Sequence, residues 1–119
     1  MPPTALLVED EDTLRSLLVE ALSLIDVDAV ECESADEALA LLEMPHDYSL
    51  VITDICMPGS IDGLELARII WTKWPEMPVI LSSGNRVVDS DHLALNSCFL
   101  RKPWALDQLH ERVIERLRH

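Results

Sequence analysis

The sequence predicts an α/β fold, a doubly wound parallel sheet of five strands with helices on both faces in a three-layer α/β/α sandwich. The first observation is that five short apolar or β-branched segments alternate with segments of helical periodicity. The second is that 119 residues, 49% of them hydrophobic, suffice for one compact domain and not for two. The five predicted strands cover residues 5–8, 28–32, 50–53, 79–82 and 98–101.

The first half of the chain carries two predicted helices. Asp12 is a candidate N-cap for the first of them. The second follows Ser34 with a capping-box pattern in which Glu37 reaches back, and Pro45 closes it. Between these helices, the strand over residues 28–32 shows only weak alternation. The apolar residues of the first helix recur at the spacing of one helix face: Leu14, Leu17, Leu18, Ala21, Leu22 and Ile25.

The second half continues the alternation. The third predicted strand leads to Asp54, and a turn-rich stretch then precedes a helix over residues 64–74 that Pro75 stops. Residues 84–97 have no clear periodicity, and whether a short helix lies near residues 89–96 stays open. The last predicted helix has arginines in its final turns, where the helix dipole favours cations, and an apolar face of Leu106, Leu109, Val113 and Leu117.

The net charge of the chain limits the kinds of molecule that it can bind. The chain has 22 acidic and nine basic side chains, a formal net charge of −13. Such a chain is repelled by polyanions, so we expect no direct binding to nucleic acid or to an anionic membrane surface. Thirteen of the acids and a single base, Arg15, lie in residues 1–50. A cluster of acidic residues is usually a solvated surface. Together with a carboxylate from elsewhere in the chain, it can also hold a hard cation.

Cysteine and hydropathy patterns indicate the compartment. Cys32, Cys56 and Cys98 are odd in number and lack CxxC spacing, which predicts free thiols in a reducing cytoplasm. The N-terminus has neither the basic region nor the apolar region of a signal peptide. The longest apolar runs are far shorter than a membrane span. We expect a soluble cytoplasmic domain over residues 1–119.

Polar side chains follow four of the predicted strands, at the edge where ligands bind in open α/β sheets. They are Glu9, Asp10, Asp54, Ser83 and Lys102. Three clustered carboxylates repel one another unless a cation holds them together, and a set of oxygen ligands without His or Cys suits Mg²⁺. An aspartate beside Mg²⁺ can attack phosphorus to form an acyl phosphate, while an ammonium and a hydroxyl hold phosphoryl oxygens. The glycine-rich motifs that cradle nucleotides are missing from the sequence.

The sequence resembles the receiver domains of response regulators from two-component systems over essentially its whole length. Each motif is weak alone, but five in order at workable spacing are specific. The resemblance implies the flavodoxin-like strand order 2-1-3-4-5. The matching segments are Leu7-Val8-Glu9-Asp10-Glu11, Val51-Ile52-Thr53-Asp54-Ile55-Cys56-Met57-Pro58, Asp62-Gly63, Ser83-Gly84 and Phe99-Leu100-Arg101-Lys102-Pro103.

The resemblance also implies roles for individual residues. Asp54 is the expected phosphoacceptor. Asp10 and Asp54 are expected to ligate Mg²⁺ directly, Cys56 through its backbone carbonyl, and Glu9 mainly through water. Lys102 matches the lysine of the family, and the Lys102-Pro103 bond matches its cis peptide. Two further positions belong to the switch: the hydroxyl of Ser83 and the aromatic ring of Phe99, for which a plain core role stays open.

The sequence departs from the family pattern in two loops and at one side chain. The loop between Pro58 and Asp62 is longer by one residue, which should alter the approach to the third helix and leave Asp54 in place. The stretch between Ser83 and Lys102 is a few residues short, which predicts a shortened or irregular fourth helix and an altered output face. Serine replaces the commoner threonine at position 83 and keeps the hydroxyl.

The expected function is that of a phosphoacceptor domain. A histidine kinase or histidine phosphotransfer protein would donate a phosphoryl group to Asp54 with Mg²⁺, and a two-state shift would signal to a downstream protein target or fused effector. The domain would assist its own phosphorylation and hydrolysis and would not be an enzyme for an external substrate. Stand-alone receiver, receiver excised from a hybrid histidine kinase, and unphosphorylated pseudo-receiver stay open. A Mg²⁺-dependent phosphatase would need a second Asp near Asp54, where position 56 is Cys.

Overall fold

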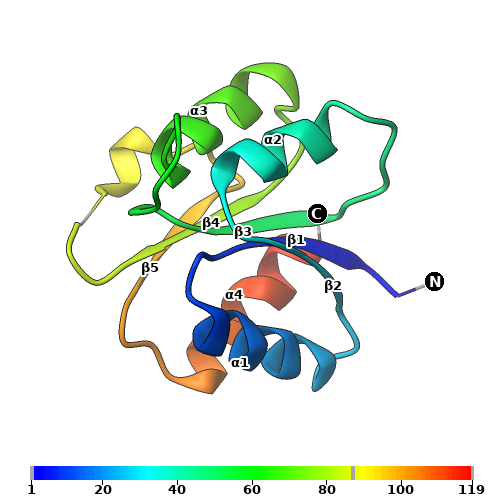
Figure 1. Cartoon of the computed structure of the whole chain (residues 1–119). Coiled ribbons are helices and arrows are strands. Elements are labelled where there is room, and N and C mark those ends of the chain that lie inside the picture. Colours follow the sequence, from blue (N-terminus) through cyan, green and yellow to red (C-terminus); the bar gives the residue numbers. More distant parts are fainter. Residues whose placement is uncertain (1, 87, 119) are drawn as a thin grey trace.

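The computed structural model describes residues 2–86 and 88–118, which form one five-stranded parallel sheet with helices on both faces (Figure 1). The strand order is β2-β1-β3-β4-β5, as the resemblance implies. Val8 pairs with Cys32 on one side and Thr53 on the other, so the carboxyl ends of these neighbouring strands lie level. The strands are β1 (Thr4–Val8), β2 (Asp28–Cys32), β3 (Leu50–Asp54), β4 (Val79–Ser83) and β5 (Cys98–Arg101).

Two helices cover each face of the sheet. The helices α1 (Asp12–Ser23) and α4 (Leu106–Leu117) lie on one face, and α2 (Ala35–Leu42) and α3 (Gly63–Lys73) lie on the other (Figure 1). Successive residues of β1 alternate between the two cores because strand side chains have a period of two. Leu6 and Val8 pack with α2 and α3, whereas Ala5 and Leu7 pack with α1 and α4.

Burial explains why some strands are easier to predict than others. The interior strand β4 is buried throughout, and its first three residues form an apolar run in the sequence. The edge strand β2 is fully buried only at Cys32, which accounts for its weak pattern. All three cysteines are free thiols, as predicted, and burial raises the pKa of Cys32 to about 12. The described helices include none long and apolar enough to cross a membrane.

Ser34 caps α2 as predicted, whereas α3 lies one residue before its predicted range of 64–74 and Asp12 is not the N-cap of α1. The Ser34 hydroxyl accepts a bond from the Glu37 amide at 3.1 Å, and α2 ends at Leu42, ahead of Pro45. The N-cap of α1 is instead Glu11, without a side-chain capping bond. Asp12 is the first helical residue, where its charge still suits the helix dipole. Its carboxylate is engaged by a basic side chain of α1 rather than by a capping amide.

The connection between β4 and β5 has little regular structure. Among its described residues only a single 3₁₀ turn, η1 (Ser90–His92), replaces the fourth helix of the family pattern, in agreement with the predicted irregularity. Val88 and Leu93 still pack against the core beneath α2 and α3. At the end of the connection the Ser97 hydroxyl accepts bonds from Trp71 Nε1 at 2.9 Å and from the Val79 amide at 3.2 Å. These contacts hold the connection to the domain without a helix.

Candidate functional site

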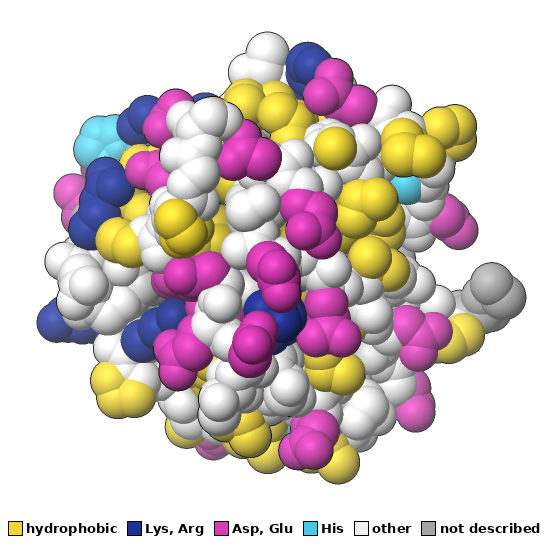
Figure 2. All heavy atoms as spheres, in the orientation of Figure 1, with side chains coloured by type: hydrophobic (Ala, Val, Ile, Leu, Met, Phe, Trp, Pro, Cys, Tyr) yellow, Lys and Arg dark blue, Asp and Glu magenta, His cyan; other side chains and the backbone are white. Residues whose placement is uncertain are grey.

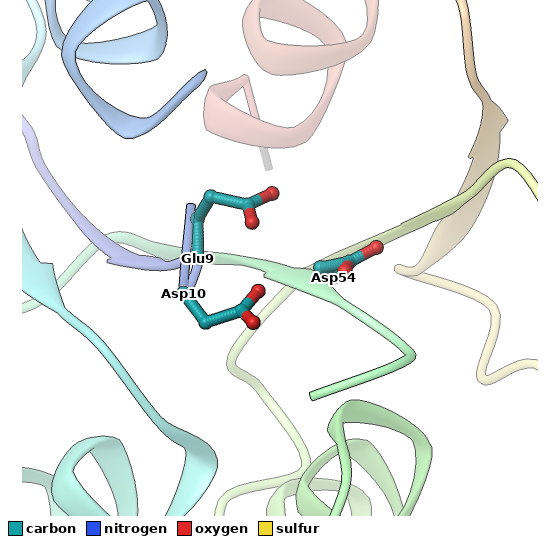
Figure 3. Close-up of side chains that lie close together, drawn as sticks. All are labelled: Glu9, Asp10 and Asp54. Atoms are coloured by element: carbon teal, nitrogen blue, oxygen red, sulfur yellow. The ribbon is translucent and has the colours of Figure 1, made fainter. Parts of the chain in front are cut away.

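Three acidic side chains meet at the carboxyl edge of the sheet (Figure 3). Glu9 and Asp10 directly follow β1, and Asp54 is the last residue of the neighbouring strand β3. One carboxylate oxygen of each residue lies within 4.8 Å of those of the other two. The predicted convergence of these acids is therefore present, and it follows from the level ends of β1 and β3.

Glu9 is the most buried of the three acids, with 3% of its surface exposed. Its Oε2 accepts a bond from the Glu11 amide at 3.1 Å, and its Oε1 accepts one from Lys102 Nζ, also at 3.1 Å. Burial raises the pKa of Glu9, and the hydrogen bonds from Glu11 and Lys102 oppose that rise. The side chain is thus fixed at both of its oxygens.

Lys102 reaches the same acids from the end of β5. Its Nζ lies 3.3 Å from Asp54 Oδ1, so the ammonium bridges Asp54 and Glu9. Burial raises the pKa of Asp54 despite the opposing charge of Lys102. Burial by itself would lower the pKa of Lys102, but its bond to Glu9 and the charge of Asp54 raise it. The ammonium is therefore charged at neutral pH. The Lys102-Pro103 bond is cis, as the resemblance implies.

The charges of this site favour a divalent cation. Three carboxylates face one ammonium, which leaves the cluster negative, and burial of Glu9 and Asp54 makes that excess charge costly. The acids line a pocket of about 540 Å³ that Cys56 and Ser83 also border. Carboxylate oxygens such as those of the three acids are the hard ligands that Mg²⁺ prefers. The residues present fit Mg²⁺.

The two predicted switch residues lie in different surroundings. Ser83 is 2% exposed, and its hydroxyl oxygen accepts bonds from the amides of Asn85 at 3.2 Å and Arg86 at 3.1 Å. Its own hydroxyl hydrogen can still be donated into the pocket. Phe99 is half-buried against the core beneath α2 and α3, and it does not line the acidic pocket. A core role for Phe99 is observed, and its switch role stays a prediction.

Arg15 contacts this site and was not among the predicted site residues. Its Nη1 donates to the backbone carbonyl of Glu9 at 2.8 Å. The sequence offered one signal, since Arg15 is the only base among residues 1–50. Its contacts depend on how α1 packs beside β1 and β2, which no local pattern reveals.

The flavodoxin-like sheet carries clustered carboxylates and a lysine at its carboxyl edge, as the resemblance to receiver domains implies. Residues 5–114 match the family model of the response regulator receiver domain, and the chain belongs to that family. Receiver domains bind Mg²⁺ at an acidic pocket, and the cluster of Glu9, Asp10 and Asp54 is the acidic pocket of this chain.

Two curated relatives of the chain are much longer proteins. It is 40% identical over 89 residues to the response regulator protein FleR of Pseudomonas aeruginosa, covering 75% of this chain and 18% of FleR. It is 36% identical over 111 residues to the C4-dicarboxylate transport transcriptional regulatory protein DctD of Rhizobium meliloti, covering 90% and 24%. The chain thus spans less than a quarter of the length of these relatives.

Solved receiver structures share the whole fold. A response regulator receiver protein from Sinorhizobium medicae WSM419 superposes with a TM-score of 0.90 at 26% identity, covering 98% of this chain and 95% of the other. The receiver domain of the hybrid histidine kinase CckA is 32% identical with a TM-score of 0.79, covering 96% and 98%. Both likenesses extend over the strands that carry the acids and the lysine.

Proposed function

We propose that Asp54 is the phosphoacceptor of this receiver domain and takes its phosphoryl group from a histidine kinase or a histidine phosphotransfer protein. The observation that carries the proposal is the convergence of Glu9, Asp10 and Asp54, with Lys102 bridging Glu9 and Asp54. Both oxygens of Glu9 are engaged, whereas Asp54 contacts Lys102 through Oδ1 and borders the pocket. Asp54 is therefore the better nucleophile of the two.

In the transfer, a carboxylate oxygen of Asp54 forms a bond to phosphorus as the phosphorus–nitrogen bond of the donor phosphohistidine breaks. The electron pair of the broken bond stays on the imidazole nitrogen. Lys102 pairs with one phosphoryl oxygen, and the Ser83 hydroxyl donates to another. Asp10, Asp54 and the Cys56 carbonyl would hold Mg²⁺, with Glu9 acting through water. The bound cation supplies neutralisation of the charge spread over the phosphoryl oxygens.

The output is a two-state shift that begins at Ser83. When its hydroxyl turns toward the phosphoryl group, the bonds it accepts from the amides of Asn85 and Arg86 are strained or lost. These amides begin the irregular connection to β5, so the connection and the ring of Phe99 respond. A downstream protein target or a fused effector would recognise the changed surface. An identical surface in phosphorylated and unphosphorylated chains would contradict this step.

The same site indicates which activities the domain does not have. The phosphoryl group ends on the domain's own Asp54, so the chain assists its phosphorylation and hydrolysis and turns over no external substrate. A net charge of −13 favours protein partners over nucleic acid or anionic membranes, and three free thiols favour the cytoplasm. The presence of Glu9, Asp10, Asp54 and Lys102 argues against a pseudo-receiver. The likeness to the CckA receiver keeps a hybrid kinase among the possible full-length contexts.

The first test is the intact mass of the chain after incubation with acetyl phosphate and Mg²⁺. We expect one phosphoryl adduct that needs Mg²⁺ and is lost in Asp54→Asn. Asp47→Asn is the matched control and should keep the adduct. Asp47 is an exposed aspartate near the amino ends of the strands, away from the pocket. A folded chain that takes no adduct from acetyl phosphate or from phosphohistidine donors would favour the pseudo-receiver.

A further inference from the structure

Arg15 is the centre of an ion-pair cluster that lies beside Glu9, a residue of the acidic pocket. It lies on α1, and only 11% of its side chain is exposed. Beyond its bond to the Glu9 carbonyl, Nη2 donates to Asp12 Oδ1 at 2.6 Å and Nε donates to Glu31 Oε1 at 3.2 Å. Glu33 Oε1 lies 3.6 Å from Nη2. Figure 2 shows Asp and Glu side chains gathered on one face of the domain with basic side chains among them.

These contacts join three separate segments of the chain. Asp12 belongs to α1, Glu31 to β2, and Glu9 to the loop that follows β1. A planar guanidinium with five donors can serve three such acceptors at once, whereas a lysine ammonium is a point charge on a flexible stem. The hydrogen bond to Asp12 raises the pKa of Arg15 above its ordinary value, so the guanidinium is always charged. Arg15 therefore links α1 to β2 and to the loop that follows β1.

The bond to the Glu9 carbonyl bears directly on the pocket. That carbonyl is part of the peptide group joining Glu9 to Asp10, and the two acids leave the backbone on either side of it. Holding the carbonyl restrains the plane of this peptide, and with it the Cα–Cβ bonds from which both carboxylates extend toward Asp54 (Figure 3). Glu9 is then held at both ends, by Arg15 on its backbone and by Lys102 on its carboxylate.

We propose that Arg15 is a positioning residue that sets the affinity of the acidic pocket for Mg²⁺ by orienting the Glu9–Asp10 peptide. The inference rests on the proposed function in that Mg²⁺ is the ligand. It adds a residue outside the pocket, one that would act through the backbone of Glu9 and not by contact with the cation or the phosphoryl group.

Charge alone predicts the opposite effect of removing Arg15. Loss of a cation near a metal site makes the site more negative, so by Coulomb's law Mg²⁺ should then bind more tightly. If Arg15 acts by orienting the peptide, the same substitution weakens Mg²⁺ binding, because the carboxylates no longer converge unaided. The sign of the change in affinity therefore separates a positioning role from a purely electrostatic one.

The experiment is calorimetric titration of the full chain with Mg²⁺ alone, for wild type, Arg15→Gln and Arg15→Lys. We expect both variants to bind Mg²⁺ about tenfold more weakly, the usual cost of losing an outer partner of a metal ligand. Arg15→Lys should not restore Mg²⁺ affinity, because lysine keeps the charge but lacks the planar set of donors of a guanidinium. Glu33→Gln, which removes the most distant acid of the cluster, is the control and should stay within about twofold of wild type.

Thermal unfolding of each variant shows whether it is folded, and Arg15→Lys keeps the test decisive if the Gln variant is not. Unchanged or tighter Mg²⁺ binding by either folded variant, or full rescue by Lys, would overturn the positioning role. At saturating Mg²⁺ the reaction of the variants with acetyl phosphate should return to within a few fold of wild type. A wild-type chain that binds Mg²⁺ but accepts no phosphoryl group would contradict the proposed function and leave the inference on Arg15 standing.

Discussion

The backbone of Gly63 packs so closely on Asp54 that a Cβ at position 63 would lie 1.8 Å from the Asp54 carbonyl oxygen. The Gly63 amide also donates to the Ile55 carbonyl at 2.9 Å, so the first residue of α3 rests on the end of β3. No real side chain tolerates such a distance without movement of the backbone. The start of α3 therefore fixes the strand end that carries the candidate acceptor.

Gly63→Ala should consequently disturb both stability and phosphorylation. Because the added methyl meets backbone and not a flexible side chain, we expect a loss of roughly 1–3 kcal/mol in the free energy of unfolding, as for other overpacking changes. The backbone shift should also slow adduct formation at Asp54. Urea unfolding and the rate of adduct formation by mass spectrometry measure the two effects.

The matched control is Gly84→Ala at the end of β4. A Cβ there would lie 3.7 Å from Lys102 Cβ, an ordinary contact, so stability should stay close to that of wild type. Equal stability of Gly63→Ala and Gly84→Ala would show that α3 can move away from Asp54 at no cost.

Lys102→Met tests the role of the ammonium. The change keeps the apolar stem and removes the charge that bridges Glu9 and Asp54. We expect adduct formation from acetyl phosphate to slow by about 10²–10³-fold, the usual effect of removing one group that stabilises transition-state charge. Mg²⁺ binding, measured by calorimetry, should persist because the carboxylates remain and lose a competing cation.

Lys73→Met is the control for this change, since Lys73 is exposed and bonded to Glu43 away from the pocket. It should react at the wild-type rate. A normal rate for Lys102→Met would mean that the lysine serves only to neutralise the two acids in the resting state.

Much of the fold and site could be predicted from the sequence for a topological reason. The buried strands β1, β3 and β4 each contain a short apolar run, and the alternation of strands with helices leads to a parallel sheet. In such a sheet the strand ends meet at one edge, so Asp54 and the acids after β1 had to converge with Lys102. No side-chain contact had to be known for that conclusion.

What escaped prediction depends on contacts between distant residues. Arg15 meets Glu31 across 16 positions, and Trp71 meets Ser97 across 26, so neither contact leaves a local pattern. The assignment of Asp12 as N-cap was wrong by one residue because its carboxylate pairs with Arg15. The connection to β5 could be predicted only as irregular, since isolated contacts hold it rather than a helical face.

Ser97→Ala tests how this connection is held. The Ser97 hydroxyl is the acceptor for two donors, Trp71 Nε1 and the Val79 amide, and Ser97 is only 8% exposed. Removing the hydroxyl leaves both donors without this partner at a buried position. The loss should cost roughly 1–3 kcal/mol in the free energy of unfolding. Ser23→Ala, a change at an exposed serine at the end of α1, should cost far less. Urea unfolding of the pair gives the comparison, and equal losses would contradict the anchoring role.

Asp54→Asn should stabilise the metal-free chain at neutral pH, although it removes the candidate acceptor. Burial raises the pKa of Asp54 above that of an unfolded aspartate, even with Lys102 beside it. A carboxyl group with a raised folded pKa supports the fold fully below its unfolded pKa, and that support is lost as pH rises through the folded pKa. At neutral pH the charged Asp54 therefore lowers stability, and an uncharged amide removes this penalty.

Thermal unfolding without divalent cations gives the measurement. The variant should unfold a few degrees above wild type at about pH 7, and the gap should narrow as the pH falls and wild-type Asp54 takes up its proton. Mg²⁺ should stabilise wild type more than the variant, because a ligand stabilises the state that binds it. Asp47→Asn, at an exposed carboxyl, is the control and should unfold at the temperature of wild type at about pH 7. A variant less stable than wild type at neutral pH would show that the ion pair with Lys102 outweighs the burial of Asp54.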